Sequence, residues 1–292
     1  MSYTSGQTVL LPEATAKKRG QRTVTVAINS RDRNLASNPY SNDFRWNLRR
    51  PLKDIVSIEL LSGCVPADLY NVNTGWNQFT FGEGTIRRVL TLTPGQYTAN
   101  GLATELQVQL ATVASSNTYT VSYSDITKKM RISALGANSF TFYFGSGDYV
   151  DTIDTYTASI TSINSPAHLF GFDPLDYIGS SSTPLIAPHR ADPDYCIKRL
   201  YLHINVDNSV ELNRVEVGVG RKDCFHIIYM DPTQNNGYYF LNKDTYLPIY
   251  YSSPAPIARI SSFYISLRDE FFRVVDLGNH DFTLVFEITV LG

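Results

Sequence analysis

The chain has 292 residues, of which 43% are hydrophobic and 18% are charged, and its formal net charge is −2. A chain of this length can form one large all-β domain or two domains, and it can bury a sizeable core without disulfides or metal ions. The small net charge gives no indication of nucleic-acid binding, and no apolar run approaches the roughly 18 residues that a membrane-spanning helix needs.

Tyrosine and phenylalanine are abundant, with 19 and 15 copies. Aromatic residues favour β-strands, and tyrosine is also enriched at protein–protein contacts, so a sheet surface and an interface both remain open for any single tyrosine. The three cysteines, Cys64, Cys196 and Cys224, are far apart and form no CxxC motif. We therefore expect no structural zinc site, and the sparse cysteine content is typical of a reducing compartment.

Residues 1–22 are expected to form an extended N-terminal arm. The segment lacks the apolar stretch of a signal peptide, and it contains the basic run Lys17, Lys18 and Arg19 near its end. Two interpretations are open: the arm is a loose tail, or it docks on a neighbouring molecule.

The first part of the chain shows the two-residue alternation of β-strands with one buried face. Runs of this kind occupy residues 24–28, 44–48, 56–60, 78–81 and 90–92. Their period of two predicts separate strands of a sheet that is covered on one side.

One segment has helical spacing instead. Leu102, Leu106 and Leu110 recur every four residues, which predicts a helix over residues 99–113. Thr98 is placed to cap the start of this helix.

Beyond the helix, residues 119–123 and 130–132 are expected to form a hairpin, and residues 140–144 a third strand. Residues 146–196 are rich in Gly, Ser, Thr, Pro and Asp, which is the composition of loops. The last third returns to strict alternation, most clearly at residues 282–290, so the chain is expected to finish inside a sheet.

These elements predict a mainly β protein, an antiparallel β-sandwich of jelly-roll type with a small inserted α+β unit that carries one helix. The sandwich is expected to comprise residues 23–92 and 197–292. The inserted helix-plus-hairpin unit and its loops are expected at residues 93–196. In this topology the first strands pair with the last ones.

The sequence contains no recognisable catalytic motif. The histidines form no HExxH or other close metal pairing, and there is no GxSxG elbow or phosphate-binding P-loop. His203 and His226 lie in strand patterns and are expected to be structural, and His280 is expected in a turn. Residues 218–223, "GVGRKD", are interpreted as a hairpin turn rather than an anion site. No catalytic residue, cofactor or metal site is predicted.

Acidic residues cluster in two loops, and a calcium site is one interpretation of each cluster. Asp148, Asp151 and Asp154 lie in the first loop, and Asp192 and Asp194 in the second. Calcium takes roughly six to eight oxygen ligands, and neither loop matches an EF-hand. Solvated loop acids are therefore the favoured interpretation.

A charged cluster, Arg31, Asp32 and Arg33, follows directly after the first strand. A carboxylate between two guanidiniums can make paired hydrogen bonds that hold a corner in place. With no nucleophile, metal motif or phosphate loop beside it, we interpret the cluster as a structural brace.

Several segments, taken in order, resemble one protein family. They are residues 28–33 ("INSRDR"), residues 44–81 with "NPYSND" before them, the element "TPGQYTANGLATELQ", the short "HLFGF" and the closing "DLGNHDFTLVFEI". This order of segments is similar to that of the minor-capsid or penton-type jelly-roll proteins of large icosahedral double-stranded DNA viruses.

The resemblance implies a structural component of an icosahedral virus capsid, a minor capsid or penton protein, that assembles through protein–protein contacts without catalysis. It implies other capsid proteins as partners, either the major capsid protein or copies of this chain, with no recognition of nucleic-acid sequence. The implied location is the virion capsid, assembled inside the host cell.

Three elements are expected to make the assembly contacts: the arm 1–22, the loops 146–196 and the aromatic segment 235–256. The aromatic residues expected at these contacts are Tyr238, Tyr239, Phe240, Tyr246, Tyr250 and Tyr251. An irregular pair of strands is an equally good interpretation of the aromatic segment.

A carbohydrate- or receptor-binding β-sandwich module of a virion or phage is the alternative function. In that case exposed tyrosines and Trp76 would stack on sugars, and loop acids would hold calcium. Glycan binding that a chelator abolishes would favour this alternative, whereas rings or shells that survive a chelator would favour the capsid protein.

Overall fold

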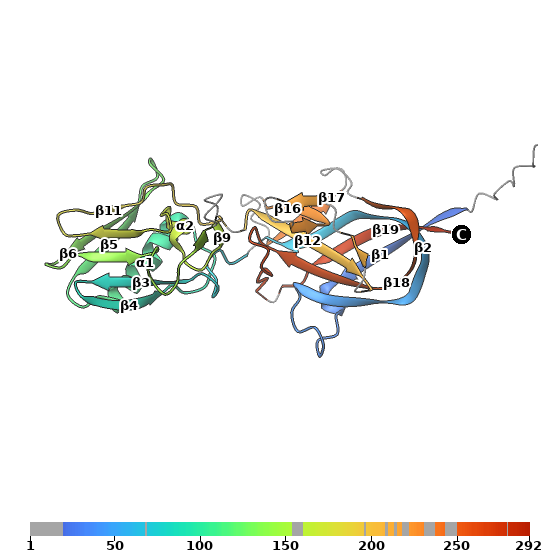
Figure 1. The fold of residues 1–292 in the computed structure, drawn as a ribbon, viewed down its shortest axis with the longest axis horizontal. Coiled ribbons are helices and arrows are strands. Elements are labelled where there is room, and N and C mark those ends of the chain that lie inside the picture. Colours follow the sequence, from blue (N-terminus) through green and yellow to red (C-terminus); the bar gives the residue numbers. More distant parts are fainter. Residues whose placement is uncertain are drawn as a thin grey trace, which may run out of the picture.

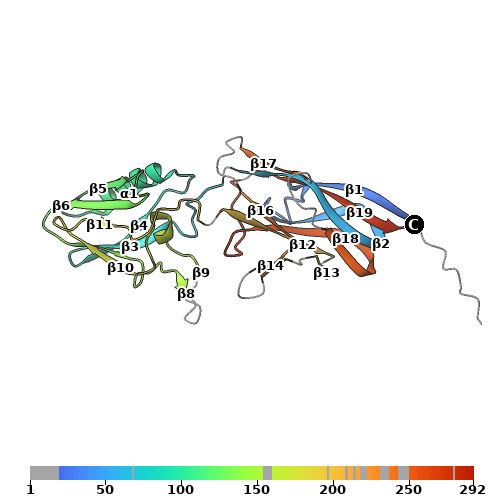
Figure 2. The same ribbon diagram turned by 90° about the horizontal axis from the view of Figure 1, so that it is seen from above.

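The computed structural model describes residues 20–67, 69–153, 160–195, 197–207, 210–212, 215–217, 222–230, 237–242, 250–278 and 280–292. Two lobes follow one another along the longest axis of the molecule (Figure 1). The view from above shows the same two lobes joined end to end, with the C-terminal end far from the smaller lobe (Figure 2). Every strand pair in both lobes is antiparallel among the described residues, which confirms the predicted mainly β, antiparallel fold class.

The larger lobe is a sandwich built on one strongly bent sheet. Its strand order is β1-β19-β2-β18-β12-β13, while β16 also pairs with β12 and β17 with β2. The strands are β1 (Gln21–Asn29), β2 (Asp43–Pro66), β12 (Arg199–Val206), β13 (Val210–Glu211), β16 (His226–Tyr229), β17 (Tyr238–Asn242), β18 (Tyr250–Arg268) and β19 (Thr283–Leu291). A separate two-stranded sheet pairs β14 (Val215–Val217) with β15 (Lys222–Cys224), and residues 218–221 of "GVGRKD", where the turn was expected, lie outside the described residues.

The first and last strands lie side by side, as predicted. β1 and β19 pair along their whole length, from Gln21 opposite Leu291 to Asn29 opposite Thr283. Alternate residues of both strands are buried, such as Ile28 and Phe286. Residues more than 250 positions apart therefore form one continuous part of the core.

The strands expected at residues 44–48 and 56–60 are one strand, β2, which runs from Asp43 to Pro66. It pairs with β18 from Asp43 to Glu59, and with β19 from Ile55 to Cys64. β17 lies beside its last residues, from Ser62 to Pro66. The register with β18 shifts between Leu52 and Asn47, and Pro51 lies in that interruption. Because proline donates no backbone hydrogen bond, it marks a strand end in a sequence pattern, and here a bulge accommodates it.

The smaller lobe packs two sheets around one helix. The first sheet has the order β10-β7-β3-β4 and the second the order β11-β6-β5. Its elements are β3 (Gln78–Glu83), β4 (Ile86–Thr91), α1 (Ala99–Val113), β5 (Thr118–Tyr123), β6 (Met130–Leu135), β7 (Phe140–Tyr143), β8 (Thr152–Ile153), β9 (Ile160–Ser162), α2 (Ala167–Phe170), β10 (Asp176–Gly179) and β11 (Leu185–Ile186). The lobe is inserted between β2 and β12 of the sandwich (Figure 1).

Helix α1 spans residues 99–113, as predicted. The Gly101 N–H donates to Oγ1 of Thr98 at 3.1 Å, so Thr98 is the expected N-cap. Leu102, Leu106 and Leu110 are fully buried. They pack in a core with the phenylalanines of β3 and β7, which include Phe79 and Phe142.

The strand pairing of the smaller lobe differs from the expected division of the chain. Residues 78–91, placed by the sequence with the sandwich, form β3 and β4, and β3 pairs with β7. Likewise, residues 146–196 are not loops throughout, since β10 extends one sheet and β11 the other. Alternation reveals that a segment is a strand but not which strand it pairs with.

In the part of the chain that the structure describes, no helix has the length and hydropathy needed to cross a membrane.

Candidate functional site at the corner between the first and last strands

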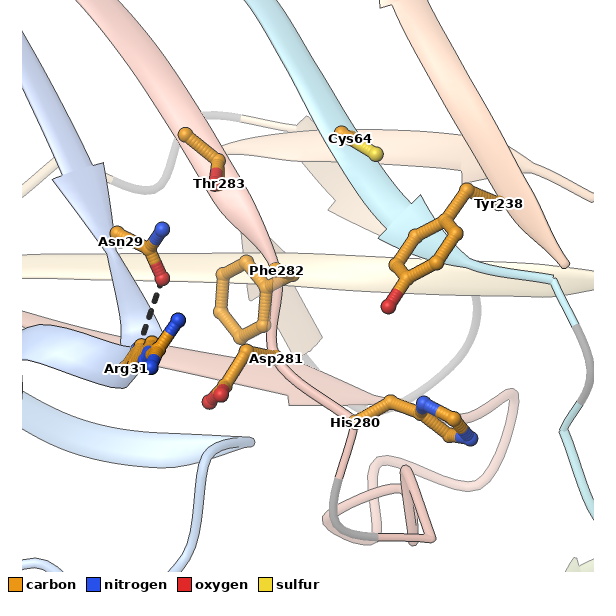
Figure 3. A pocket seen from close by; sticks show the side chains of 8 residues that line it. All are labelled: Asn29, Arg31, Cys64, Tyr238, His280, Asp281, Phe282 and Thr283. Atoms are coloured by element: carbon orange, nitrogen blue, oxygen red, sulfur yellow. Dashed lines mark hydrogen bonds between the residues drawn. The ribbon is translucent and has the colours of Figure 1, made fainter.

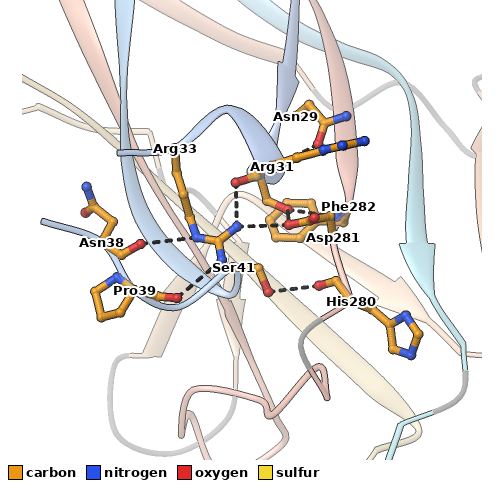
Figure 4. Close-up of polar contacts among 10 residues, drawn as sticks. Asn29, Arg31, Arg33, Asn38, Pro39, Ser41, His280, Asp281 and Phe282 are labelled. Carbon is orange, nitrogen blue, oxygen red and sulfur yellow. Dashed lines mark hydrogen bonds and ion pairs between the residues drawn. The ribbon is translucent and has the colours of Figure 1, made fainter. Parts of the chain in front are cut away.

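The charged cluster after β1 forms a tightly bonded corner (Figure 4). A short 3-10 helix, Ser30–Asp32, ends β1, and Arg33 follows it with a side chain that is only 11% exposed. One guanidinium nitrogen of Arg33 donates to Oδ1 of Asp281 at 2.9 Å and to the Ser30 carbonyl at 2.7 Å. The other two nitrogens donate to the carbonyls of Asn38 and Pro39. Arg33 therefore fixes the loop after β1 and joins it to the segment before β19.

Ser30 closes the same corner from the other side. Its hydroxyl donates to Oδ1 of Asp281 at 2.8 Å and accepts from the Phe282 N–H at 2.9 Å. Its own N–H donates to the Phe282 carbonyl, also at 2.9 Å. The carboxylate that Arg33 contacts is thus that of Asp281 and not that of neighbouring Asp32.

The roles within the predicted brace are therefore unequal. Arg33 makes the bracing contacts, whereas Arg31 takes part through its backbone N–H, which donates to Oδ1 of Asn29 at 2.9 Å. Asp32 and the side chain of Arg31 are exposed. The expected carboxylate between two guanidiniums is not what holds this corner.

An open pocket of about 390 Å³ lies beside the brace (Figure 3). It is lined by Asn29, Arg31, Cys64, Tyr238, His280, Asp281, Phe282 and Thr283. Strand register brings these elements together, because Asn29 lies opposite Thr283, Thr283 opposite Cys64, and Cys64 opposite Phe240. Phe282 is buried and forms the floor, and the Tyr238 ring lies edge-on to the His280 ring at 6.4 Å.

Aromatic side chains are exposed beside this pocket. Phe240 is 67% and Tyr238 36% exposed, whereas Tyr239 between them is only 8% exposed and faces the core. The loop after β1 also exposes Leu35 and Tyr40.

The other predicted contact residues are only partly described. Tyr246 lies outside the described residues, and Tyr250 and Tyr251 are described only by their strand pairing with Glu59 and Ile58. Tyr239 is corrected from a contact residue to a core residue, because period-two alternation turns every second residue of β17 inward. Most of the arm 1–22 lies outside the described residues, and Gln21 and Arg22 already belong to β1.

Of the two histidines in strands, His226 is buried and His203 is half-buried. Burial lowers the pKa of His226 to about 4, and burial together with Arg268 lowers the pKa of His203 to about 4. Both are therefore neutral at physiological pH, as suits the structural role expected of them. His280 lies in the turn before β19, where its N–H donates to the Leu277 carbonyl.

The acidic loop residues mainly hold backbone or pair with cations. Asp151 is buried and accepts from the N–H groups of Asn164 and Ser165, and Asp192 pairs with Lys198. Asp154 lies outside the described residues. Within the described residues, no group of three or more His, Cys, Asp or Glu side chains is arranged to hold a metal ion.

Trp76 is not available for stacking on a sugar. It is only 4% exposed, and the Arg273 guanidinium covers its ring at 4.1 Å from the ring centre. Its indole N–H donates to the Asn71 carbonyl at 2.9 Å. The expectation that Trp76 is an exposed platform is therefore wrong, because the junction of the two lobes encloses it.

Arg273 links the two lobes. It lies between β18 and β19, and its guanidinium donates to the Ile163 carbonyl of the smaller lobe at 2.7 Å and to Oδ2 of buried Asp269 at 2.9 Å. Neither Arg273 nor Asp281 was singled out from the sequence. Both residues contact segments that are distant in the sequence, and the spacing of residues along the chain does not reveal such contacts.

The bent antiparallel sheet, the paired first and last strands and the inserted α+β lobe define a two-lobed β-sandwich scaffold. A family model described as "Family of unknown function (DUF5901)" matches residues 14–171, more than half of the chain, and the chain belongs to this family. No curated protein sequence matches it.

Two solved structures are similar over nearly their whole length. A crystal structure of the mavirus penton protein is 9% identical, with 92% of this chain and 99% of that chain covered and a TM-score of 0.47. A chain of the Sputnik virophage, solved by cryo-EM, is 11% identical, with 92% and 98% covered and a TM-score of 0.32. Both likenesses are remote in sequence and in geometry.

Proposed function

We propose that the chain is a structural component of an icosahedral virus capsid, a minor capsid or penton protein, that assembles through protein–protein contacts and performs no catalysis. Its partners are other capsid proteins, either the major capsid protein or copies of itself. Its place is the virion capsid, which is assembled inside the host cell.

The corner between the first and last strands carries this proposal. The two ends of the sequence pattern that resembles capsid proteins, residues 28–33 and 276–288, meet there in space and bond to each other through Arg33 and Asp281. The pattern is thus one structural unit, although its parts are far apart in the chain. Tyr238 of β17 lies beside this unit, next to His280, and both Tyr238 and Phe240 are exposed.

Side chains that could be reactive have structural roles in this fold, as expected for a scaffold protein. His226 is buried and neutral, Arg273 covers Trp76, and Asp151 holds loop backbone. These groups stabilise the fold, while the side chains left at the surface of the corner are those that partner proteins bury: tyrosine, phenylalanine and arginine.

Assembly of the purified chain tests the proposal. We expect expression alone or with candidate major capsid proteins to yield rings, shells or incorporation into particles, visible by electron microscopy and unchanged by EDTA. A chain that stays monomeric with every capsid protein offered, and that binds glycans only without chelator, would instead be the carbohydrate-binding module.

The N-terminal arm is tested by deletion. Because β1 begins at Gln21, the deletion should remove residues 1–19 and leave the β1–β19 pairing complete. We expect reduced incorporation into particles with unchanged thermal stability. Normal incorporation of the shortened chain would show that the arm is only a tail.

A further inference from the structure

The pocket beside the brace contains an excess of hydrogen-bond donors. Oδ1 of Asn29 already accepts from the Arg31 N–H, which leaves the amide NH₂ of Asn29 as a donor. The guanidinium of Arg31, the hydroxyl of Tyr238 and the ring of His280 also line the pocket. Among the described residues, none of these four groups has a hydrogen-bond partner.

The one carboxylate in the pocket is already compensated. Oδ1 of Asp281 accepts from both Arg33 and Ser30, and Arg33 balances its charge. The uncompensated charge in the pocket is therefore the guanidinium of Arg31, which is positive at all physiological pH values. Burial raises the pKa of Cys64, so this thiol adds no negative charge.

The arrangement of these groups suits a ligand that enters from outside. Asn29 and Arg31 lie on one side of the pocket and Tyr238 and His280 on the other, with Asp281 and Phe282 between them (Figure 3). Donors on two sides of one pocket can hold the oxygen atoms of a carboxylate. Exposed Phe240, which lies opposite Cys64 in the strand register, extends the site with an apolar surface.

We propose that this pocket binds an acidic side chain carried by an extended segment of a neighbouring protein chain, with an apolar residue of the same segment packed on Phe240. This proposal rests on the proposed function, because it names the chemistry by which a partner protein would bind at the corner between β1 and β19. Arg31 supplies the charge, and Asn29 and Tyr238 orient the carboxylate.

A protein carboxylate fits this surface better than nucleic-acid phosphate does. The same outer face of the sheet places Glu287 of β19 directly opposite Glu59 of β2. A nucleic-acid backbone brings many phosphates along such a face, so these two carboxylates would repel it, whereas a single side chain in the pocket avoids them.

Peptide binding to the full chain tests the pocket directly. The probe is a capped peptide, Ac-Ser-Glu-Phe-Ser-NH₂, compared with its glutamine counterpart, and NMR follows the Arg31 side chain and the Tyr238 ring. We expect saturable shifts at both with the glutamate peptide and about tenfold weaker binding of the glutamine peptide, which loses the charge-assisted hydrogen bonds. A decathymidylate is the nucleic-acid probe, and we expect no saturable shifts from it.

Variants locate the binding. Arg31→Gln is expected to weaken binding of the glutamate peptide about tenfold, and Tyr238→Phe several-fold. Arg22→Gln is the matched control, because Arg22 is also exposed on this edge but lies opposite Val290, far from the pocket. Thermal unfolding checks that all variants are folded.

Several results would overturn the proposal: no saturable shift with the glutamate peptide, equal affinity for the two peptides, an Arg31→Gln variant that binds normally, or tighter and Arg31-dependent binding of the decathymidylate. If the unmodified chain nevertheless assembles into particles, the proposed function stands and only the pocket assignment fails. If the peptide binds as expected but the chain never joins a particle, the pocket stands and the capsid function fails.

Discussion

Arg33 and Asp281 are 248 residues apart in the chain, yet their side chains are 2.9 Å apart and share a corner with Ser30. The Arg33 guanidinium is mostly buried and has four acceptors, three of them backbone carbonyls. This contact ties the end of the first strand to the start of the last.

The first prediction concerns this contact. Asp281→Asn and Arg33→Lys are each expected to lower the free energy of unfolding by about 1–3 kcal/mol, because each leaves buried hydrogen-bonding groups without partners. Urea unfolding measures the change. Asp32→Asn, one residue from Arg33 but exposed, is the control and is expected to change stability by less than about 0.5 kcal/mol.

The double variant separates a direct contact from two independent effects. If Arg33 and Asp281 stabilise each other, the loss in the double variant is smaller than the sum of the two single losses by about 0.5–3 kcal/mol. Strict additivity would contradict a shared brace.

The second prediction concerns Glu83, at the end of β3. Its carboxylate accepts from the N–H groups of Ser115, Ser116 and Asn117, which follow helix α1. Burial raises the pKa of Glu83, but these hydrogen bonds outweigh it and lower the pKa to about 2. Glu83→Gln is expected to lower the free energy of unfolding by about 2–3 kcal/mol at pH 7.

The sign of the pH effect follows from the lowered pKa. Because folding favours the ionised form of Glu83, its contribution is complete above pH 4.5 and is lost as the pH falls toward 2. The difference in stability between the wild type and Glu83→Gln should therefore shrink across this window. Glu105→Gln serves as the comparison variant, because the Glu105 carboxylate also accepts a hydrogen bond from a backbone N–H, near the opposite end of α1.

The third prediction concerns acid sensitivity at a higher pH. Folding disfavours protonation of His203 and His226, so the unfolded chain takes up protons first and stability falls as the pH drops from 6.5 toward 4. For His226 the full loss is about 3 kcal/mol. His226→Gln should flatten the slope of unfolding free energy against pH between 6.5 and 4.5, above the window of Glu83.

A control for this slope is available in the same lobe. His280→Gln changes an exposed histidine on a turn and is expected to leave the slope as it is in the wild type. An unchanged slope in His226→Gln would mean that its burial does not govern the acid response.

The fourth prediction concerns the junction of the lobes. Arg273→Lys keeps the charge but loses the planar group that covers Trp76 and donates to Ile163 and Asp269. We expect a loss of about 1–3 kcal/mol and a change in tryptophan fluorescence as water reaches the indole ring.

Small-angle X-ray scattering adds a readout of lobe arrangement for the same variant. Arg273→Lys is expected to broaden the distribution of distances between the lobes, whereas Arg259→Lys, exposed on β18, is not. Identical scattering and fluorescence in Arg273→Lys and wild type would rule out a linking role for Arg273.

Periodicity along the chain was sufficient to predict helix α1 and the longer strands, but it missed the short strands β10 and β11 and gave no strand partners. The alternation that ends at Val290 correctly indicated a strand, and the spacing of Leu102, Leu106 and Leu110 correctly indicated α1. The pairing of β3 with β7 joins segments about sixty residues apart, and hydrophobic patterns contain no information on such partners.

The candidate site was predictable in part for the same reason. The cluster that contains Arg33 was predicted to be a brace because it follows directly after a strand, but the partner of Arg33, Asp281, lies in an ordinary turn. Tyr239 was grouped with its neighbours by composition, although the strand turns it inward. The type of each residue was evident from the sequence, whereas the direction of its side chain followed from the alternation along the strand.

The pairing of β1 with β19 sets an order of events during synthesis. The smaller lobe has all of its paired strands once residue 186 has been made, but β1 lacks its neighbour until residues 283–291 emerge from the ribosome. At roughly 5–20 residues per second, the synthesis of these roughly 100 residues takes about 5–20 seconds. During this time the apolar face of β1 lies uncovered. The inserted lobe is therefore the first part of the nascent chain that can fold. The N-terminal strand β1, although it is synthesised earlier, is among the last strands to pair.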